Sequence, residues 1–143
     1  MKIEFSSIGI IHTPYKEIAP FRPNENAKGE FIIKIDKEYQ KALSGLEKFQ
    51  YIIVYFYFDR STKKNLLAHP PSSGGKEVGL FASRSPNRFN GIGMDIVKLI
   101  RIEKNIIYTS GLDALDNTPL LDIKPYIENL DSKPGAGNGW IDL

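Results

Sequence analysis

The sequence predicts a mainly β fold in a single domain, residues 1–143, with short strands and one short helix. We expect a small closed or nearly closed β-barrel, although strand patterns alone leave a sandwich open. Three observations support this fold class. Short runs rich in β-branched and aromatic residues recur along the chain. Only one run carries helical spacing. No linker, repeat or low-complexity tract divides the 143 residues.

The expected helix runs from Lys37 to Ser44. Asp36 can cap its first turn, and Gly45 can end it. Tyr39 and Leu43 lie four residues apart and therefore share one face of the helix.

The expected strands are the runs with the highest β propensity, and one pair of them is joined by a tight turn at Lys104–Asn105. These strands are Ile3–His12, Glu30–Ile35, Tyr51–Asp59, Val78–Ser83, Met94–Ile102, Ile106–Leu112 and Leu120–Ile123.

The stretch Tyr51–Phe58 is the most apolar part of the chain and shows no polar alternation. We therefore expect a central strand that is buried on both faces. Two alternatives stay open: an aromatic platform on which RNA bases stack, and a strand that seals a subunit interface.

Composition narrows the classes of function. The net charge is only +2, so binding to RNA would need a local basic surface, such as Lys63–Lys64 with Arg60, or Arg84 with Arg88. There is no cysteine, the first residues lack a signal-peptide pattern, and no apolar run approaches the roughly 20 residues of a membrane helix. These features predict a cytoplasmic protein without a membrane segment. The two histidines lack metal-ligand spacing, so we expect no metal site.

The stretch from Gly79 to Gly93, GLFASRSPNRFNGIG, has the pattern of a ligand-binding loop that follows a strand. Arg84 and Arg88 offer planar donor groups for carboxylate or phosphate. Gly91 and Gly93 allow either close approach of a ligand to the backbone or a positive φ. A second stretch, Ser110–Tyr126, carries acidic residues that complement these arginines.

Together with IGIIHTPY at residues 8–15 and GLEKF at residues 45–49, these two stretches resemble the TsaA-like, or TrmO-like, family over nearly the whole chain. The resemblance implies the barrel rather than the sandwich, and it implies a homodimer. It also implies S-adenosyl-L-methionine as cofactor. The best-described members of the family methylate N6 of threonylcarbamoyl-adenosine beside the anticodon of tRNA. We therefore expect an S-adenosylmethionine-dependent tRNA methyltransferase.

Carried over by position, the resemblance implies cofactor contacts in four segments: Phe21, Arg22, Pro23, Asp59, Arg60, Arg84, Met94, Leu112, Asp113, Ala114, Leu115 and Asp116. We expect Arg84 to supply charge, Met94 and Leu115 to pack on the adenine, and one of the aspartates to bind ribose or methionine groups. Asp122 and Tyr126 are weak catalytic candidates for accepting the proton of the acceptor nitrogen.

Two departures from the family pattern bear on the acceptor. The usual loop sequence Arg-Pro-Asn-Pro-Ile-Gly is here Arg88-Phe-Asn-Gly-Ile-Gly93, and the usual His-Gln or His-Lys is Asp59–Arg60. Three classes of function stay open: a methyltransferase acting on modified adenosine in tRNA, a methyltransferase with another acceptor, and a non-catalytic module that binds the nucleoside cofactor or RNA.

Overall fold

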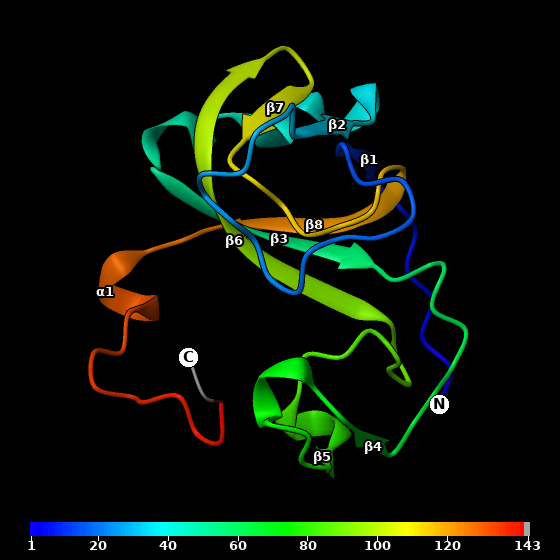
Figure 1. The fold of residues 1–143 in the computed structure, drawn as a ribbon. Helices are drawn as coiled ribbons and strands as arrows, with labels where there is room; N and C mark the ends of the chain where they lie inside the picture. The colour runs from blue at the N-terminus through cyan, green and yellow to red at the C-terminus, as the bar shows by residue number, and fades with distance from the viewer. Residues whose placement is uncertain (142–143) are drawn as a thin grey trace.

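The computed structural model describes residues 1–141, so the last two residues of the expected domain lie outside it. Six antiparallel strands form one sheet that closes into a ring in the order β1-β2-β7-β6-β3-β8 (Figure 1). Their bounds are β1 Gly9–His12, β2 Ile32–Ile35, β3 Tyr51–Tyr57, β6 Ile92–Glu103, β7 Ile106–Thr109 and β8 Thr118–Pro125. The mainly β, closed architecture expected from the sequence is confirmed.

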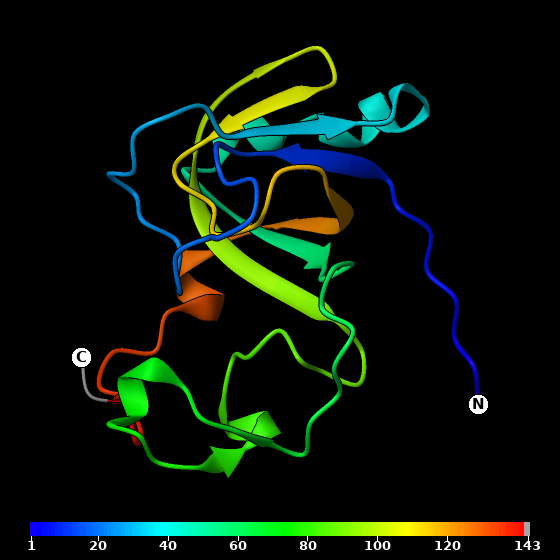
Figure 2. The same cartoon turned by 45° about the vertical axis from the view of Figure 1, so that its right-hand side comes forward.

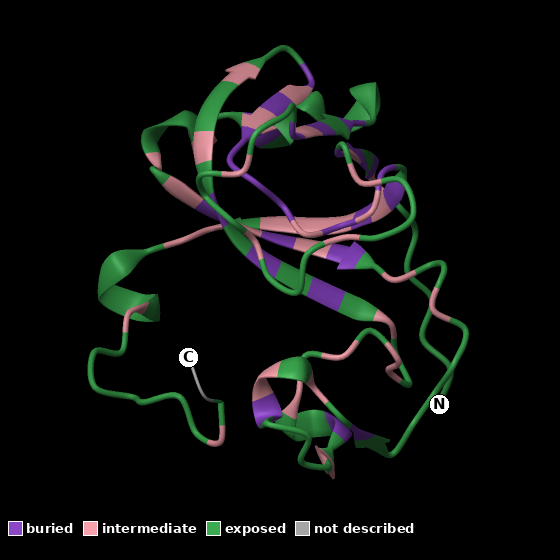
Figure 3. Ribbon diagram, in the orientation of Figure 1, coloured by how far each residue is buried: buried purple, intermediate pink, exposed green. Residues whose placement is uncertain are grey.

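The core of the ring consists of side chains at alternate positions of its strands, as the two-residue period of a β-strand requires. On β3, Ile52, Val54 and Phe56 are at most 1% exposed. Strands β1, β2, β6, β7 and β8 supply further buried residues: Ile11, Ile33, Ile35, Val97, Ile107 and Leu120. Figure 3 shows the resulting alternation of buried and exposed residues most clearly along β6.

The expectation that β3 is buried on both faces is wrong. Its outward residues Tyr51, Ile53 and Tyr55 are only partly buried, and Tyr57 is 46% exposed. In a closed ring of six strands one face of each strand points inward and the other points outward, so an apolar strand need not be covered twice.

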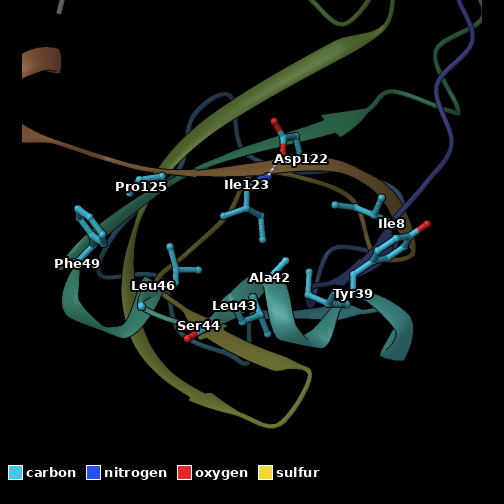
Figure 4. A pocket seen from close by; sticks show the side chains of 12 residues that line it. Ile8, Tyr39, Ala42, Leu43, Ser44, Leu46, Phe49, Asp122, Ile123 and Pro125 are labelled. Atoms are coloured by element: carbon cyan, nitrogen blue, oxygen red, sulfur yellow. Dashed lines mark hydrogen bonds between the residues drawn. The ribbon is translucent and has the colours of Figure 1, made fainter.

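Two short 3₁₀ helices, η1 Lys37–Leu43 and η2 Leu46–Lys48, cover the end of the ring at which β1 begins and β2 ends. The expected helix therefore exists as a 3₁₀ helix, and Asp36 makes no side-chain cap with it. Gly45 ends it with a φ of 90°, as predicted. A pocket of about 350 Å³ lies between these helices and β8. Leu43, Leu46 and Ile123 point into it (Figure 4).

Between β3 and β6 the chain makes a long excursion away from the ring (Figure 2). It contains a two-stranded sheet of β4 Leu67–Ala68 and β5 Val78–Gly79, followed by η4 Leu80–Ala82, with η3 Pro71–Ser73 between the two strands. The expected strand Val78–Ser83 is therefore wrong beyond Gly79. The backbone N–H and hydroxyl of Ser83 both donate to the Leu80 carbonyl, at 3.0 and 2.7 Å, and close a turn instead.

The chain continues from β8 into a short helix, α1 Glu128–Asp131, which the sequence analysis did not predict. Beyond it the Trp140 indole donates a hydrogen bond to the Ala82 carbonyl at 2.8 Å. The C-terminal segment is thereby attached to the excursion, 58 residues away in sequence.

The predicted strand Ile3–His12 is wrong over its first half, because β1 begins at Gly9 and residues 1–7 are exposed. Ile8 makes the last ladder contacts, donating to the Leu120 carbonyl and accepting from the Asp36 amide, and within residues 1–141 no strand pairs with the residues before it. Other strand ends differ by a few residues from prediction. The turn at Lys104–Asn105 is confirmed, and Lys104 adopts a φ of 54°.

Over residues 1–141 the structure contains no helix of the length and apolarity that crossing a membrane requires.

Candidate functional site

Three loops meet at one end of the ring, because β1, β3 and β7 finish there and β2, β6 and β8 begin there. These loops are residues 13–31, 58–91 and 110–117. They carry every residue that the sequence analysis assigned to cofactor contacts except Met94, which lies near the start of β6. Segments far apart in sequence are thus brought to one place by strand register.

The first and third of these loops are joined at Gly111. The Asn24 amide donates to the Gly111 carbonyl at 3.2 Å and forms an isolated bridge between the two segments. A Cβ at position 111 would lie 2.2 Å from the Asn24 carbonyl oxygen and 2.8 Å from the Ala27 Cβ. Only glycine permits this approach, which holds the segment with Phe21, Arg22 and Pro23 against the residues that precede Leu112.

Arg60 connects the second loop to the third through Thr118, the first residue of β8. Its guanidinium donates to the Thr118 hydroxyl at 3.0 Å and to the Asp59 carboxylate at 3.2 Å. The Thr118 hydroxyl in turn donates to the Leu115 carbonyl at 2.6 Å. Asp59, Arg60 and Leu115 are therefore connected by a chain of hydrogen bonds.

Asp95 is a residue of this site that the sequence analysis missed. It is 3% exposed, on the inner face of β6, and its carboxylate accepts a hydrogen bond from the Asp113 amide at 3.0 Å. Burial, together with the neighbouring Asp113 carboxyl, raises the pKa of Asp95 to about 8. Burial also raises the pKa of Asp113, while the positive charge of Arg84 opposes both changes. The sequence does contain a signal for Asp95: it is a polar residue at an inward position of an otherwise apolar strand pattern.

Asp116 is buried, and its carboxylate already has three hydrogen-bond donors within the protein. Its carboxylate accepts from the His12 ring at 3.2 Å, the Thr13 amide at 3.1 Å and the Lys16 ammonium at 2.6 Å. The Lys16 partner lowers the pKa of Asp116, and the amide and imidazole contacts act in the same direction. In this structure Asp116 joins the first loop to the third, and its predicted contact with the cofactor stays a prediction.

The other predicted cofactor residues differ in exposure. Phe21, Arg22 and Arg84 are exposed at the loop surfaces, and Pro23 is partly buried. Leu112 and Ala114 are 0% and 3% exposed and belong to the core, so they offer a ligand backbone groups rather than side chains. Met94 is 37% exposed and lies on the outer face of β6, opposite Tyr55 of β3.

The two catalytic candidates lie on β8 and just after it, apart from the loop cluster. Asp122 accepts from Lys124 at 3.1 Å and from the Ile123 amide at 2.9 Å, and Figure 4 shows it on the opposite side of β8 from the Ile123 side chain. Tyr126 packs edge-on against Tyr51, with ring centroids 6.3 Å apart. Their catalytic roles stay predictions.

Within residues 1–141 no cluster of three or more histidine, aspartate and glutamate side chains has the arrangement of a metal site. His12 pairs with Asp116, and His69 pairs with Glu77 at 3.1 Å on the excursion.

The sequence of residues 10–132 matches the model of the tRNA-methyltransferase O N-terminal domain. The chain belongs to this family. A probable S-adenosyl-L-methionine-binding protein of Pyrococcus abyssi is 36% identical over 99% of the chain and 78% of its own length. A similarly named protein of Archaeoglobus fulgidus is also 36% identical, and the chain spans 39% of it. A mouse protein named tRNA (adenine(37)-N6)-methyltransferase is 38% identical, and the chain spans 29% of it.

The fold of the tRNA-methyltransferase O family is found in solved structures as well. A crystal structure of TrmO from Pseudomonas aeruginosa superimposes with a TM-score of 0.82 at 31% identity, over 99% of this chain and 64% of that chain. The chain thus spans less than two thirds of this structure and of several longer relatives.

In this member of the tRNA-methyltransferase O family, side-chain hydrogen bonds hold the first part of the glycine-rich loop, before the positions of Phe89 and Gly91. The Arg88 guanidinium donates to the carbonyls of Ser83 and Ser85 at 3.0 and 3.1 Å, so it stabilises the loop from within. Neither Gly91 nor Gly93 adopts a positive φ. Gly93 instead makes room for the Phe56 ring, which a Cβ would approach to 2.4 Å. The space left by the missing side chain of Gly93 is therefore filled by a residue of the protein core.

Proposed function

We propose that this protein is an S-adenosylmethionine-dependent methyltransferase, acting in the cytoplasm on N6 of the modified adenosine beside the anticodon of tRNA. The observation that carries the proposal is the convergence of three loops at one end of the ring in a member of this family. The contact Asn24–Gly111 joins the first loop to the third, while Arg60–Thr118 and Asp95–Asp113 tie the second and third loops to the strands β8 and β6. The names of the mouse relative and of the solved TrmO structures support the assignment of reaction and substrate.

The donor set of the loop cluster fits the proposed cofactor. S-adenosylmethionine supplies an activated methyl group on a sulfonium, and it also carries an ammonium, a carboxylate and ribose hydroxyls. Arg84 is exposed and can bind the carboxylate, while Asp113 can accept from an ammonium or a hydroxyl. The acidic pair Asp95 and Asp113 favours a ligand that brings positive charge. The protein's contribution to methyl transfer is then chiefly positioning and the local electrostatic field.

The proposal predicts that the protein binds S-adenosylmethionine and that Arg84→Ala weakens this binding by roughly tenfold or more, because a charge-assisted hydrogen bond contributes about 1.5–3 kcal/mol. Calorimetric titration measures the affinity. Arg101→Ala is the matched control, since Arg101 is an exposed arginine on the hairpin at the opposite end of the ring, and it should leave affinity unchanged.

The same preparation then receives radiolabelled cofactor and total tRNA, with and without its threonylcarbamoyl modification. Transfer to the modified tRNA alone supports the full proposal. Transfer regardless of the modification indicates another acceptor. Binding without transfer to either pool favours a cofactor-binding module, which is also what the names of the Archaeoglobus fulgidus and Pyrococcus abyssi relatives describe. Absence of cofactor binding contradicts the proposal.

We also propose that the protein forms a homodimer through the outer face of β3 and β6. Ile92, Met94 and Ile96 of β6 are 41%, 37% and 42% exposed. Their register partners on β3 are Tyr57, Tyr55 and Ile53, so six apolar or aromatic side chains are adjacent on one surface. A surface of this kind is typical of a protein–protein interface. Met94 belongs both to this surface and to the expected cofactor contacts, so a second copy bound here would lie beside the proposed cofactor site.

Ile96→Lys is expected to convert the dimer to a monomer, because it places a charge within this apolar surface. The mass in solution, measured by light scattering over a dilution series, checks the result. Ile10→Lys is the matched control: Ile10 is also 42% exposed and points outward, but from β1, on the opposite side of the ring. A wild-type monomer, or a dimer that both variants retain, contradicts this interface.

A further inference from the structure

Asp95 occupies an unusual position for a carboxyl group. It lies on the inner face of β6 between Gly93 and Val97, both buried, and its register partner on β3 is the fully buried Val54. Asp95 itself is only 3% exposed to solvent. A carboxylate at such a place destabilises the fold unless it is protonated or compensated by partners.

Two ionisable groups of the described chain act on Asp95, each from a different loop. Asp113 lies on the loop between β7 and β8. Its backbone amide donates a hydrogen bond to the Asp95 carboxylate at 3.0 Å, and its own carboxyl also acts on Asp95. Arg84, on the loop that follows η4, contributes positive charge. Because the Asp113 amide binds the buried Asp95 carboxylate, the two residues are direct neighbours, and ionising both carboxyls has a large free-energy cost, so one proton is retained between them.

We propose that Asp95 is a positioning residue for Asp113: it holds the Asp113 backbone by a hydrogen bond and shares one proton with the Asp113 carboxyl. The pair then carries a single negative charge in the free protein. A cationic ligand that binds beside Asp113 releases the shared proton to solvent, so that the pair becomes doubly negative. This step rests on the proposed function, because S-adenosylmethionine is the cation in question.

The electrostatics of the pair agree with this assignment. The pKa of Asp95 is raised to about 8, and that of Asp113 is raised as well, chiefly by burial. The retained proton is therefore present at neutral pH and leaves as pH rises through about 8. A bound cation lowers the pKa of the pair, so cofactor affinity must increase with pH over this interval.

The test compares wild type with two variants in calorimetric titrations with S-adenosylmethionine between about pH 6 and 8.5. Asp95→Asn keeps a carbonyl oxygen for the Asp113 amide but has no carboxyl to titrate, whereas Asp95→Ala keeps neither. The α-amino group of the ligand itself titrates near pH 8, so the difference between wild type and Asp95→Asn is the readout. Buffers with different ionisation enthalpies report the number of protons released.

We expect wild-type affinity to rise with pH relative to Asp95→Asn, by about tenfold for each pH unit by which the cation lowers the pKa of the pair. We also expect wild type to release more protons. Asp95→Ala should bind weakly throughout. Equal pH dependence and equal proton release in wild type and Asp95→Asn would overturn the proposal.

Thermal unfolding without ligand separates failure of this inference from failure of the proposed function. The folded-state pKa of Asp95 lies above its unfolded value, so the folded protein binds more protons between about pH 4 and 8. Wild-type stability should therefore fall relative to Asp95→Asn as pH rises through this range, and the difference should level off above it. If the cofactor does not bind but this difference is present, the proposed function fails while Asp95 still retains a proton in the folded protein; parallel melting curves contradict the retained proton itself.

Discussion

Asp116→Ala is expected to destabilise the protein by about 2–3 kcal/mol and to weaken cofactor binding at the same time. The carboxylate joins His12 of β1 and Thr13 and Lys16 of the first loop to the third loop. Removing it leaves the amide of Thr13, which is 5% exposed, without its acceptor. Unsatisfied buried donors have a high free-energy cost, whereas the exposed Lys16 can be hydrated.

Lys16→Ala is the matched control, because it removes only the exposed partner of the same carboxylate. It should change stability by less than about 1 kcal/mol. Denaturant unfolding measures both variants, and calorimetry measures their affinity for S-adenosylmethionine. If Asp116→Ala unfolds at the same denaturant concentration as wild type, the carboxylate does not hold these loops together.

Asp116 also gives the protein a pH dependence of defined sign. Its folded-state pKa lies below the unfolded value of 3.8, so its stabilisation is present above that pH and is lost as pH falls through the folded pKa. The stability deficit of Asp116→Ala should accordingly be largest near neutral pH and should shrink in acid. A deficit that is independent of pH would assign the effect to packing alone.

Gly111→Val is expected to separate the first loop from the third. Even the Cβ would lie 2.2 Å from the Asn24 carbonyl oxygen, which is backbone and cannot rotate away. Overpacking of this kind costs about 1–3 kcal/mol of stability. Residues 21–23 directly precede Asn24, so a displacement of Asn24 also displaces them. Cofactor affinity should therefore fall well beyond what the loss of stability explains.

Gly79→Ala serves as the control for Gly111→Val. Gly79 lies on the excursion at a φ of −61°, and no atom lies within 4 Å of its added Cβ. This variant should unfold and bind like wild type. Wild-type affinity in a folded Gly111→Val protein would show that the first loop does not contribute to the cofactor site.

Local signals predicted the fold well where a single residue decides the backbone. Gly45 ends η1 and the Lys104–Asn105 turn joins β6 to β7, both as expected from residue type. Val78–Ser83 failed because the apolar run has the propensity of a strand, while the Ser83 hydroxyl competes for the Leu80 carbonyl. The apolar pattern of β3 could not reveal that its outer face lacks a covering layer, since that depends on how the sheet closes.

The loop cluster was predictable as a set of segments but not as a set of contacts. The sequence indicated that the arginine-bearing and aspartate-bearing stretches belong together. It could not show that Arg88 binds carbonyls of its own loop, or that Asp116 is occupied by three donors. Asp95 was missed because its partner Asp113 is 18 residues away and its burial follows from strand register.

The closure of the main sheet limits how another macromolecule can dock on this protein. Each of its six strands has a neighbour on both sides, so over residues 1–141 the ring has no strand that is unpaired along a whole edge and open to addition of a foreign strand. Recognition of a second copy or of an RNA by the ring must therefore depend on outward side chains and on loops, whereas the two-stranded sheet of β4 and β5 on the excursion does have open edges. Binding specificity can then change through single surface substitutions, while the hydrogen-bond ladder of the ring stays as it is.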